Sequence, residues 1–143
     1  MQAFIPYFST IGRILISAIF LLSGISKTSA FEATEGYMAA MGVPAEMLPI
    51  VIVFEMGAAI AVIIGFKTRV VAFMLAGFTL LTAVLFHNPL GDQVQFIMFM
   101  KNIAIAGGFL FLVANGPGAL ALDNRMKART LFNSQAQSHG QTR

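Results

Sequence analysis

Long apolar stretches separated by short polar segments dominate the pattern of this chain. About 20 apolar residues, each rising about 1.5 Å, are needed to cross a hydrocarbon core roughly 30 Å thick. Four stretches reach that length, at about residues 7–26, 48–66, 70–87 and 94–114. The pattern therefore predicts an all-α integral membrane protein with four spanning helices.

The connections between the later stretches are short. Lys67-Thr68-Arg69 separates the second stretch from the third, and Asn88-Pro89-Leu90-Gly91-Asp92 separates the third from the fourth. Connections of this length force neighbouring helices to run antiparallel. We therefore predict a four-helix bundle with up-down-up-down topology, formed by one domain over residues 1–124.

The first connection is long enough to contain a helix of its own. Ser29-Ala30-Phe31-Glu32 has the Ser-x-x-Glu form of a capping box, and Gly42 before Val43-Pro44 is a typical helix stop. Phe31, Thr34, Met38 and Met41 recur between them at helical spacing. We expect a short helix in this outer loop that lies in the membrane interface or caps the bundle.

The end of the chain is polar. Residues 134–143 are rich in Gln, Ser and Gly and have no apolar periodicity. Because such composition cannot bury enough apolar surface to fold, residues 125–143 are expected to be a disordered cytoplasmic tail.

Composition supports a membrane protein. Hydrophobic residues make up 57% of the 143 residues and charged residues 10%, against roughly 25% charged residues in an ordinary soluble domain. A soluble domain of this size would bury only about two-thirds of its unfolded surface and would leave much of this apolar content exposed. Cysteine is absent, which excludes disulfides and thiol chemistry within the chain.

The charges are divided between the two ends of the predicted helices. Glu32, Glu35, Glu46 and Asp92 lie at one end with Lys27, and the other end holds Lys67, Arg69, Arg125, Lys127, Arg129 and Arg143. Because cytoplasmic loops carry the excess of Lys and Arg, both termini are expected in the cytoplasm. We interpret the net charge of +3 as a topology signal and predict no nucleic-acid partner.

A cleaved signal peptide is the alternative interpretation of the first stretch. Its apolar core would run from Ile14 to Leu22, with cleavage near Thr28-Ser29-Ala30. The single charge before that core is Arg13, placed thirteen residues into the chain, and the stretch is long enough to span. Both features favour a retained helix.

Three charged residues lie inside the predicted spans: Arg13, Glu55 and Lys101, with His87 at the end of the third. Charges in a bilayer are costly, so they face the bundle interior or mark a functional site. Glu55 and Lys101 share a depth of roughly 10 Å from the outer ends. Either Glu55 pairs with Lys101 or Arg13 to fix helix register, or these residues line a pocket with His87 and Asn102. Snorkelling or contact with a partner is the third possibility.

Two predicted helices place these charges beside small residues. One face of the first helix and one face of the fourth are expected to point inward together. They consist of Arg13, Ser17, Phe20, Gly24 and Lys27 in the first, and of Lys101, Ala104, Gly108 and Phe111 in the fourth.

Motifs for metal and redox-cofactor binding are not found in the sequence. The histidines are His87 and His139, of which the second lies in the predicted tail, so a bis-histidine haem site is excluded and a single haem ligand at His87 is the weaker alternative. No phosphate-binding glycine loop, Ser-His-Asp arrangement or carboxylate pair is visible. We therefore predict no metal site and no intrinsic cofactor.

Several motifs occur in an order that resembles the DoxX family, and most closely its YqjF-type members. The likeness covers roughly residues 10–125. The motifs are Gly12-Arg13, Phe20 to Lys27, Gly42-Val43-Pro44, Phe54-Glu55-Met56-Gly57, Gly65-Phe66-Lys67-Thr68-Arg69 and Met100 to Gly108.

The resemblance implies a four-helix protein of the bacterial inner membrane. Some relatives are attached to quinone-linked or thiosulfate-linked redox complexes, whereas distant relatives look like membrane chaperones, so the family does not settle whether the chain is an enzyme. The family's polar positions fall on Arg13, Lys27, Glu55 and Lys101, to which no catalysis is assigned.

Two functional hypotheses follow. In the first, the chain is an accessory subunit of a quinone-linked redox system, with Glu55, Lys101 and His87 lining a pocket for a bound quinone. The quinone carbonyls accept hydrogen bonds, a buried carboxylate carries the coupled proton, and a membrane partner exchanges the electrons. In the second, the chain is a noncatalytic assembly factor, chaperone or scaffold. A solute or proton pathway ranks last, because the third stretch has no charge before His87.

Overall fold

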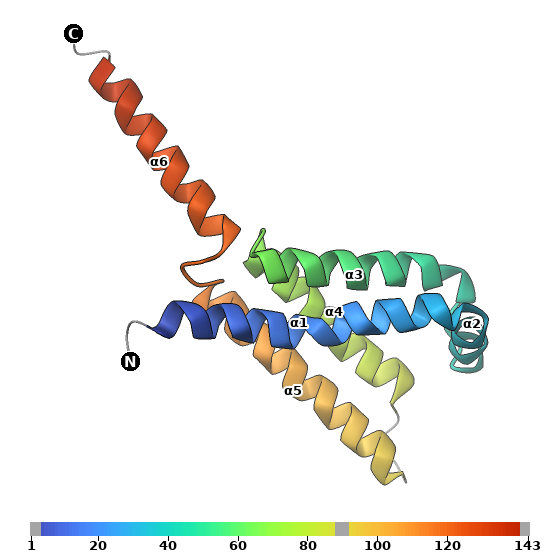
Figure 1. The fold of residues 1–143 in the computed structure, drawn as a ribbon. Helices are drawn as coiled ribbons and strands as arrows, with labels where there is room; N and C mark the ends of the chain where they lie inside the picture. Colours follow the sequence, from blue (N-terminus) through green and yellow to red (C-terminus); the bar gives the residue numbers. More distant parts are fainter. Residues whose placement is uncertain (1–3, 88–91, 141–143) are drawn as a thin grey trace.

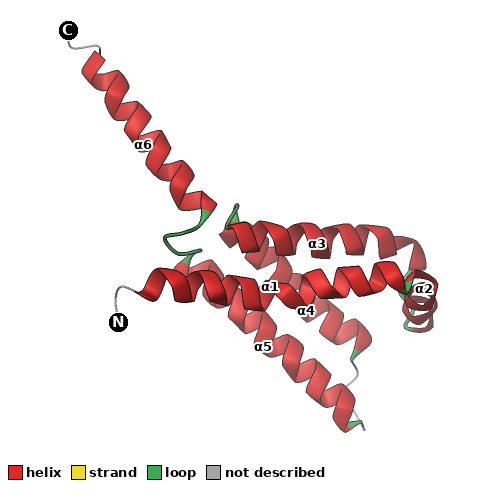
Figure 2. Ribbon diagram, in the orientation of Figure 1, coloured by secondary structure: helices red, strands yellow, loops and turns green. Residues whose placement is uncertain are grey.

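The computed structural model describes residues 4–87 and 92–140 of the chain, and helices dominate this part (Figures 1 and 2). The predicted turn between the third and fourth spans falls mostly on residues 88–91, outside the described ranges. The helices are α1 (Ile5–Ser29), α2 (Phe31–Ala40), the 3₁₀ helix η2 (Ala45–Met47), α3 (Leu48–Ile64), α4 (Thr68–Phe86), α5 (Gln93–Asn115) and α6 (Leu122–Gly140).

Four helical segments are long and apolar enough to cross a membrane: Pro6–Ser29, Ala45–Ile64, Thr68–Phe86 and Gln93–Asn115. They confirm the four predicted spans, with bounds that differ by a few residues. Large apolar side chains on their outer surfaces are exposed, for example Val53 at 73% and Val84 at 71%. Such a surface is suited to lipid.

The spanning helices form two closely packed pairs. α1 packs mainly on α3, and α4 packs mainly on α5. Successive spanning helices run in opposite directions, and the start of α1 lies at the same end as the start of α6 (Figure 1). We call this the inner end and the end that holds α2 the outer end. The α4–α5 pair diverges from the α1–α3 pair toward the outer end (Figure 1).

The core lies where the two pairs meet. Phe20 of α1 and Phe109 of α5 form an edge-to-face pair with ring centroids 5.5 Å apart. Ala72, Ala76 and Ala83 of α4 are almost fully buried. Small side chains let helix backbones approach closely within a membrane, so these alanines define the packing face of α4.

The first outer connection contains a helix, α2, at the predicted place but lacks the predicted capping box. Ser29 belongs to the last turn of α1, and its hydroxyl donates to the carbonyl of Ile25 at 3.2 Å. The residue before α2 is Ala30, which has no side-chain cap. The capping-box prediction is therefore wrong, because α1 continues three residues beyond the predicted span. The chain turns at Gly42 with φ of +74°, in agreement with the predicted stop.

Residues Leu122–Gly140 form the helix α6, in the region that the sequence analysis expected to be a polar tail over residues 125–143. The helix extends away from the spanning helices (Figures 1 and 2). Arg125-Met126-Lys127-Ala128-Arg129 consists of strong helix formers, and Asp123 in the first turn favours the helix dipole. A helix that does not pack on the spanning helices requires no apolar periodicity, so the pattern did not reveal it.

Asp123 fixes the tight turn between α3 and α4. Its carboxylate accepts hydrogen bonds from Lys67 N at 2.7 Å and from the Thr68 amide and hydroxyl at 2.9 Å each. Burial acts to raise the pKa of Asp123, but these hydrogen bonds from Thr68 and Lys67, together with the charge of Lys127, hold the pKa below its ordinary value. Asp123 therefore anchors the start of α6 to the first turn of α4.

Candidate functional site

An ion pair between Lys27 of α1 and Glu55 of α3 lies in the outer half of the molecule. Lys27 Nζ donates to the two carboxylate oxygens of Glu55 at 2.9 and 3.0 Å, and to Ser23 Oγ at 2.5 Å. The Glu55 side chain is 5% exposed and that of Lys27 is 23% exposed. The prediction that Glu55 pairs with Lys101 or Arg13 is therefore wrong.

Local sequence explains how α1 and α3 bring this pair together. Ser23 and Lys27 are four residues apart and so lie on one face of the helix. Gly24, on the same face, allows close approach, because a Cβ atom there would lie 2.5 Å from Met56 Cγ of α3. The inward face predicted for the first helix is confirmed, since Arg13, Ser17 and Phe20 are also buried.

Arg13 lies at the inner end, away from the ion pair. It is 2% exposed, and its Nη1 donates to the carbonyls of Val62 and Ile63 at 3.0 Å each. These carbonyls belong to the last turn of α3, where a positive charge is favoured by the helix dipole. Arg13 therefore caps α3 and lines a separate cavity of about 570 Å³ near Ser9.

The other predicted site residues line one cavity of about 550 Å³ at the outer end, which we call the outer cavity. It contains Glu55, His87, Lys101 and Asn102, and it also contains Lys27. Aromatic side chains form much of its wall: Phe20, Tyr37, Phe54, Phe78 and Phe86. The structure thus brings four of the five predicted residues together and leaves out Arg13.

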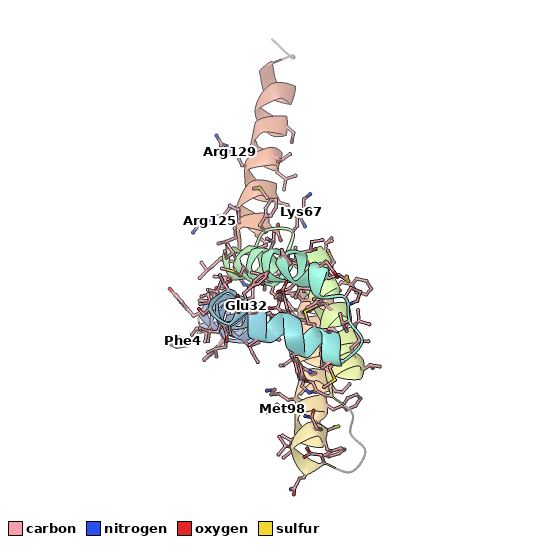
Figure 3. All side chains as sticks on the ribbon, turned by 90° about the vertical axis from the view of Figure 1, so that its right-hand side faces the viewer. Phe4, Glu32, Lys67, Met98, Arg125 and Arg129 are labelled. Atoms are coloured by element: carbon pink, nitrogen blue, oxygen red, sulfur yellow. The ribbon has the colours of Figure 1, made fainter. Side chains whose placement is uncertain are left out.

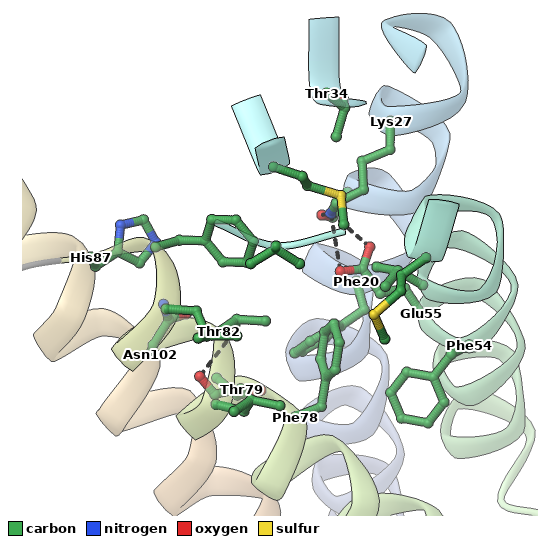
Figure 4. A pocket seen from close by; sticks show the side chains of 18 of the residues that line it. Phe20, Lys27, Thr34, Phe54, Glu55, Phe78, Thr79, Thr82, His87 and Asn102 are labelled. Atoms are coloured by element: carbon green, nitrogen blue, oxygen red, sulfur yellow. Dashed lines mark hydrogen bonds and ion pairs between the residues drawn. The ribbon is translucent and has the colours of Figure 1, made fainter. Parts of the chain in front are cut away.

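Polar groups lie on opposite walls of the outer cavity. The Lys27–Glu55 pair is on the wall formed by α1 and α3, whereas Thr82, His87 and Asn102 are on the wall formed by α4 and α5 (Figure 4). His87 Nδ1 lies 3.0 Å from Gln95 Oε1, which holds the ring in place at the end of α4. The cavity therefore combines an apolar, aromatic interior with polar groups on both sides.

Helix α2 closes the outer side of the cavity. The Tyr37 ring stacks on Phe86 with centroids 5.7 Å apart, and its hydroxyl donates to the Phe86 carbonyl at 3.4 Å. Met38 is 4% exposed and also lines the cavity. The sequence analysis did not assign Tyr37 to the site, because a tyrosine in a connecting helix carries no signal for the position of a distant cavity.

Lys101 is on the rim of the cavity and is exposed. The buried residues of α5 are Ala106 and Phe109. The prediction that Lys101, Ala104, Gly108 and Phe111 face inward together is therefore wrong, since Ala104 and Phe111 are exposed. One residue of a helix corresponds to about 100° of rotation, so a shift of one position moves Asn102 to the inner side and Lys101 to the edge.

Lys27 is the site residue whose role the sequence analysis missed, although it placed Lys27 on the inward face of the first helix. The signal was the series of Ser23, Gly24 and Lys27 at the end of that face. Within residues 4–87 and 92–140, no group of three His, Asp or Glu side chains lies close enough together to hold a metal ion.

Comparison with known proteins gives consistent matches. A family model described as DoxX matches residues 8–88. The inner membrane protein YqjF of Escherichia coli is 46% identical over 119 residues, which cover 83% of this chain and 92% of that protein. The inner membrane protein YphA of the same organism is 42% identical over 127 residues, covering 84% and 91%. No solved structure matches significantly.

The matched region contains both residues of the ion pair, and the relatives are matched over nearly their whole length. Both relatives are named as inner membrane proteins, which agrees with the four apolar helices of this chain. The chain therefore belongs to the DoxX family and is a multi-pass inner membrane protein of the YqjF type.

Proposed function

We propose that the chain is an accessory subunit of a quinone-linked redox system and that its outer cavity binds the quinone head group. The observation that carries the proposal is the cavity of about 550 Å³, in which an aromatic wall lies between two sets of polar groups. Ligand sites are typically apolar cavities of this size with a few polar groups that fix orientation.

The chemistry of a quinone suits this arrangement. A quinone is a flat apolar ring with two carbonyl oxygens that accept hydrogen bonds, and the aromatic side chains offer faces for the ring. Lys27 on one wall and Asn102 on the other carry N–H donors. Lys27 would donate to the quinone in exchange for one of its two hydrogen bonds to Glu55. Lys27 thus takes the role that the sequence analysis gave to Lys101.

Glu55 is the proton-carrying group in this proposal. Reduction of a quinone to a quinol takes up two electrons and two protons, and a carboxylate beside an ammonium group can relay protons one at a time. The electrons come from a partner subunit, because side chains such as Glu55, Lys27 and His87 transfer protons rather than electrons.

The proposal includes an orientation with both termini in the cytoplasm. Lys67 and Arg125 lie near the start of α6 and Arg129 lies further along it (Figure 3), whereas Glu32 belongs to α2 at the outer end. An excess of positive residues marks the cytoplasmic side. The outer cavity then lies in the half of the membrane that faces the periplasm.

A noncatalytic assembly or scaffold protein is the second candidate. One observation favours it: the ammonium of Lys27 is fully engaged by Ser23 and Glu55, as expected of a pair that only fixes the register of α1 against α3. This candidate predicts that no quinone stays with the protein.

Mass spectrometry of the small molecules retained after gentle extraction from the native membrane separates the two candidates. We expect stoichiometric quinone with the wild-type chain and at least about a tenfold loss in Glu55→Gln. The neutral amide no longer holds the Lys27 ammonium in place, and a hydrogen bond from that charged donor to the quinone contributes about 1.5–3 kcal/mol. Glu46→Gln, at an exposed position outside the cavity, is the matched control. Bulk phospholipid alone in the wild-type sample would refute the quinone proposal.

A further inference from the structure

Lys101 carries a charge on an exposed side of a spanning helix, at the rim of the outer cavity. It lies eight residues after Gln93, the first residue of α5, or roughly 12 Å along the helix axis. Its ammonium group contacts Met98 Sδ at 3.2 Å, and within the described residues the one ion pair is that of Lys27 and Glu55. A charge left in hydrocarbon is costly, so a functional partner is expected.

The carboxylates of this chain are already engaged or lie outside α1, α3, α4 and α5. Glu55, the one carboxylate within α1, α3, α4 and α5, is paired with Lys27. Asp92 accepts a hydrogen bond from Val94 N at the start of α5, and Asp123 binds the first turn of α4 at the inner end. The remaining carboxylates lie in α2 and η2. A second copy of the chain would therefore offer no unpaired carboxylate on a spanning α-helix opposite Lys101.

Small and apolar residues continue the exposed surface of α5 beside Lys101. We call Ile97, Lys101, Ala104 and Gly107 the Lys101 face; all four are exposed. Gly107 has open space where a Cβ atom would lie. Small residues on a spanning helix permit close approach of another helix, so the surface fits a helix better than it fits loosely packed lipid.

The Lys101 face also borders a side of the outer cavity. Ile19 of α1 and Lys101 of α5 both line the cavity and both are exposed. Met98, one turn before Lys101, lies on the part of α5 that stands apart from α1 and α3 (Figure 3). A helix seated here would cover the cavity where it opens toward the bilayer between α1 and α5.

We infer that the Lys101 face is the docking surface for a spanning helix of a different membrane protein, which places an Asp or Glu carboxylate opposite Lys101. Charge complementarity identifies the occupant, because pairing removes the cost of the isolated ammonium and of the isolated carboxylate together. We identify this helix as part of the electron-transferring subunit, and that identification rests on the proposed function. The docking of a helix on the Lys101 face is tested independently of it.

Site-specific photocrosslinking in the native membrane tests the docking. p-Benzoylphenylalanine is introduced at Ala104 on the Lys101 face, and at Val84, an exposed position of α4, as the matched control. We expect the Ala104 probe to crosslink one other membrane protein, at a spanning segment that contains Asp or Glu. The yield should fall at least about tenfold in Lys101→Met, in line with the loss of a charged pair, and should be retained in Lys101→Arg.

Three results would overturn the inference: a crosslinked segment without a carboxylate, crosslinks only to lipid or to a second copy of the chain, or an unchanged yield in Lys101→Met. Crosslinking yield and quinone retention, measured together in the wild-type chain and in Glu55→Gln, separate this inference from the proposed function. If the crosslink persists while neither the wild-type chain nor any variant retains quinone, the docking surface stands and the quinone proposal falls.

Discussion

Removal of Lys27 and of Glu55 should have unequal effects on stability. Lys27→Met leaves the Glu55 carboxylate, which is 5% exposed, without its partner, and breaking a buried pair from one side costs about 3–5 kcal/mol. Glu55→Gln leaves Lys27, whose side chain is 23% exposed and still binds Ser23. A polar group that keeps a partner and some access to water loses less, about 1–3 kcal/mol.

The double variant Lys27→Met/Glu55→Gln should be more stable than Lys27→Met alone, because the neutral amide no longer requires a positive partner. The coupling between the two sites is therefore expected to be about 2 kcal/mol or more, obtained from a double-mutant cycle. Unfolding in dodecylmaltoside micelles titrated with sodium dodecyl sulfate, followed by circular dichroism, gives the four free energies of unfolding. Additive effects of the two single substitutions would refute the reasoning, as would Lys27→Met matching the stability of wild type.

Three further predictions concern the turns and the topology. Gly65→Ala should lower the free energy of unfolding by about 2 kcal/mol or more, because Gly65 has φ of +78° and a Cβ atom there would lie 2.5 Å from the Cβ at position 121. The control Gly77→Ala, at a position with open space, should be neutral or stabilising. Equal unfolding midpoints for the two variants would contradict this. The pKa of Asp123 is lowered on folding, so its contribution is present above about pH 4 and is lost as pH falls through the lowered pKa. The thermal midpoint should fall on that acid side in wild type, and an equal fall in Asp123→Asn would count against the anchor. A reporter fused after Arg129 should be cytoplasmic and one inserted near Ala39 periplasmic; the reverse would sink the proposed orientation.

Most of the fold could be predicted from hydropathy and from the lengths of the connections. The four spans and the short connection after α3 follow from the lengths of the apolar runs, because a bilayer sets a minimum length for each helix. The inward face of α1 was also predictable, since a spacing of three and four residues places Arg13, Ser17 and Phe20 on one side. α6 was not predictable in this way, because a solvated helix lacks an apolar face.

Charged and polar residues of the candidate site could be predicted from the sequence, but the ion pair within it could not. Four of the five predicted residues line the outer cavity, because charged groups in a membrane tend to gather where they are shielded from lipid. The predicted pairing of Glu55 with Lys101 or Arg13 was wrong. Similar depth along two helices does not determine how each helix is rotated about its own axis. Rotation of α5 placed Lys101 at the edge, and the close approach permitted by Gly24 brought Lys27 to Glu55.

The most direct test of the central claim is photolabelling of the chain in native membranes with an azidoquinone, followed by peptide mapping. The account predicts labelling concentrated on residues of the outer cavity such as Tyr37, Phe86 and Phe20, displaced by unlabelled quinone and lost in Glu55→Gln. Labelling spread evenly over the lipid-facing surface, and unaffected by unlabelled quinone, would contradict it.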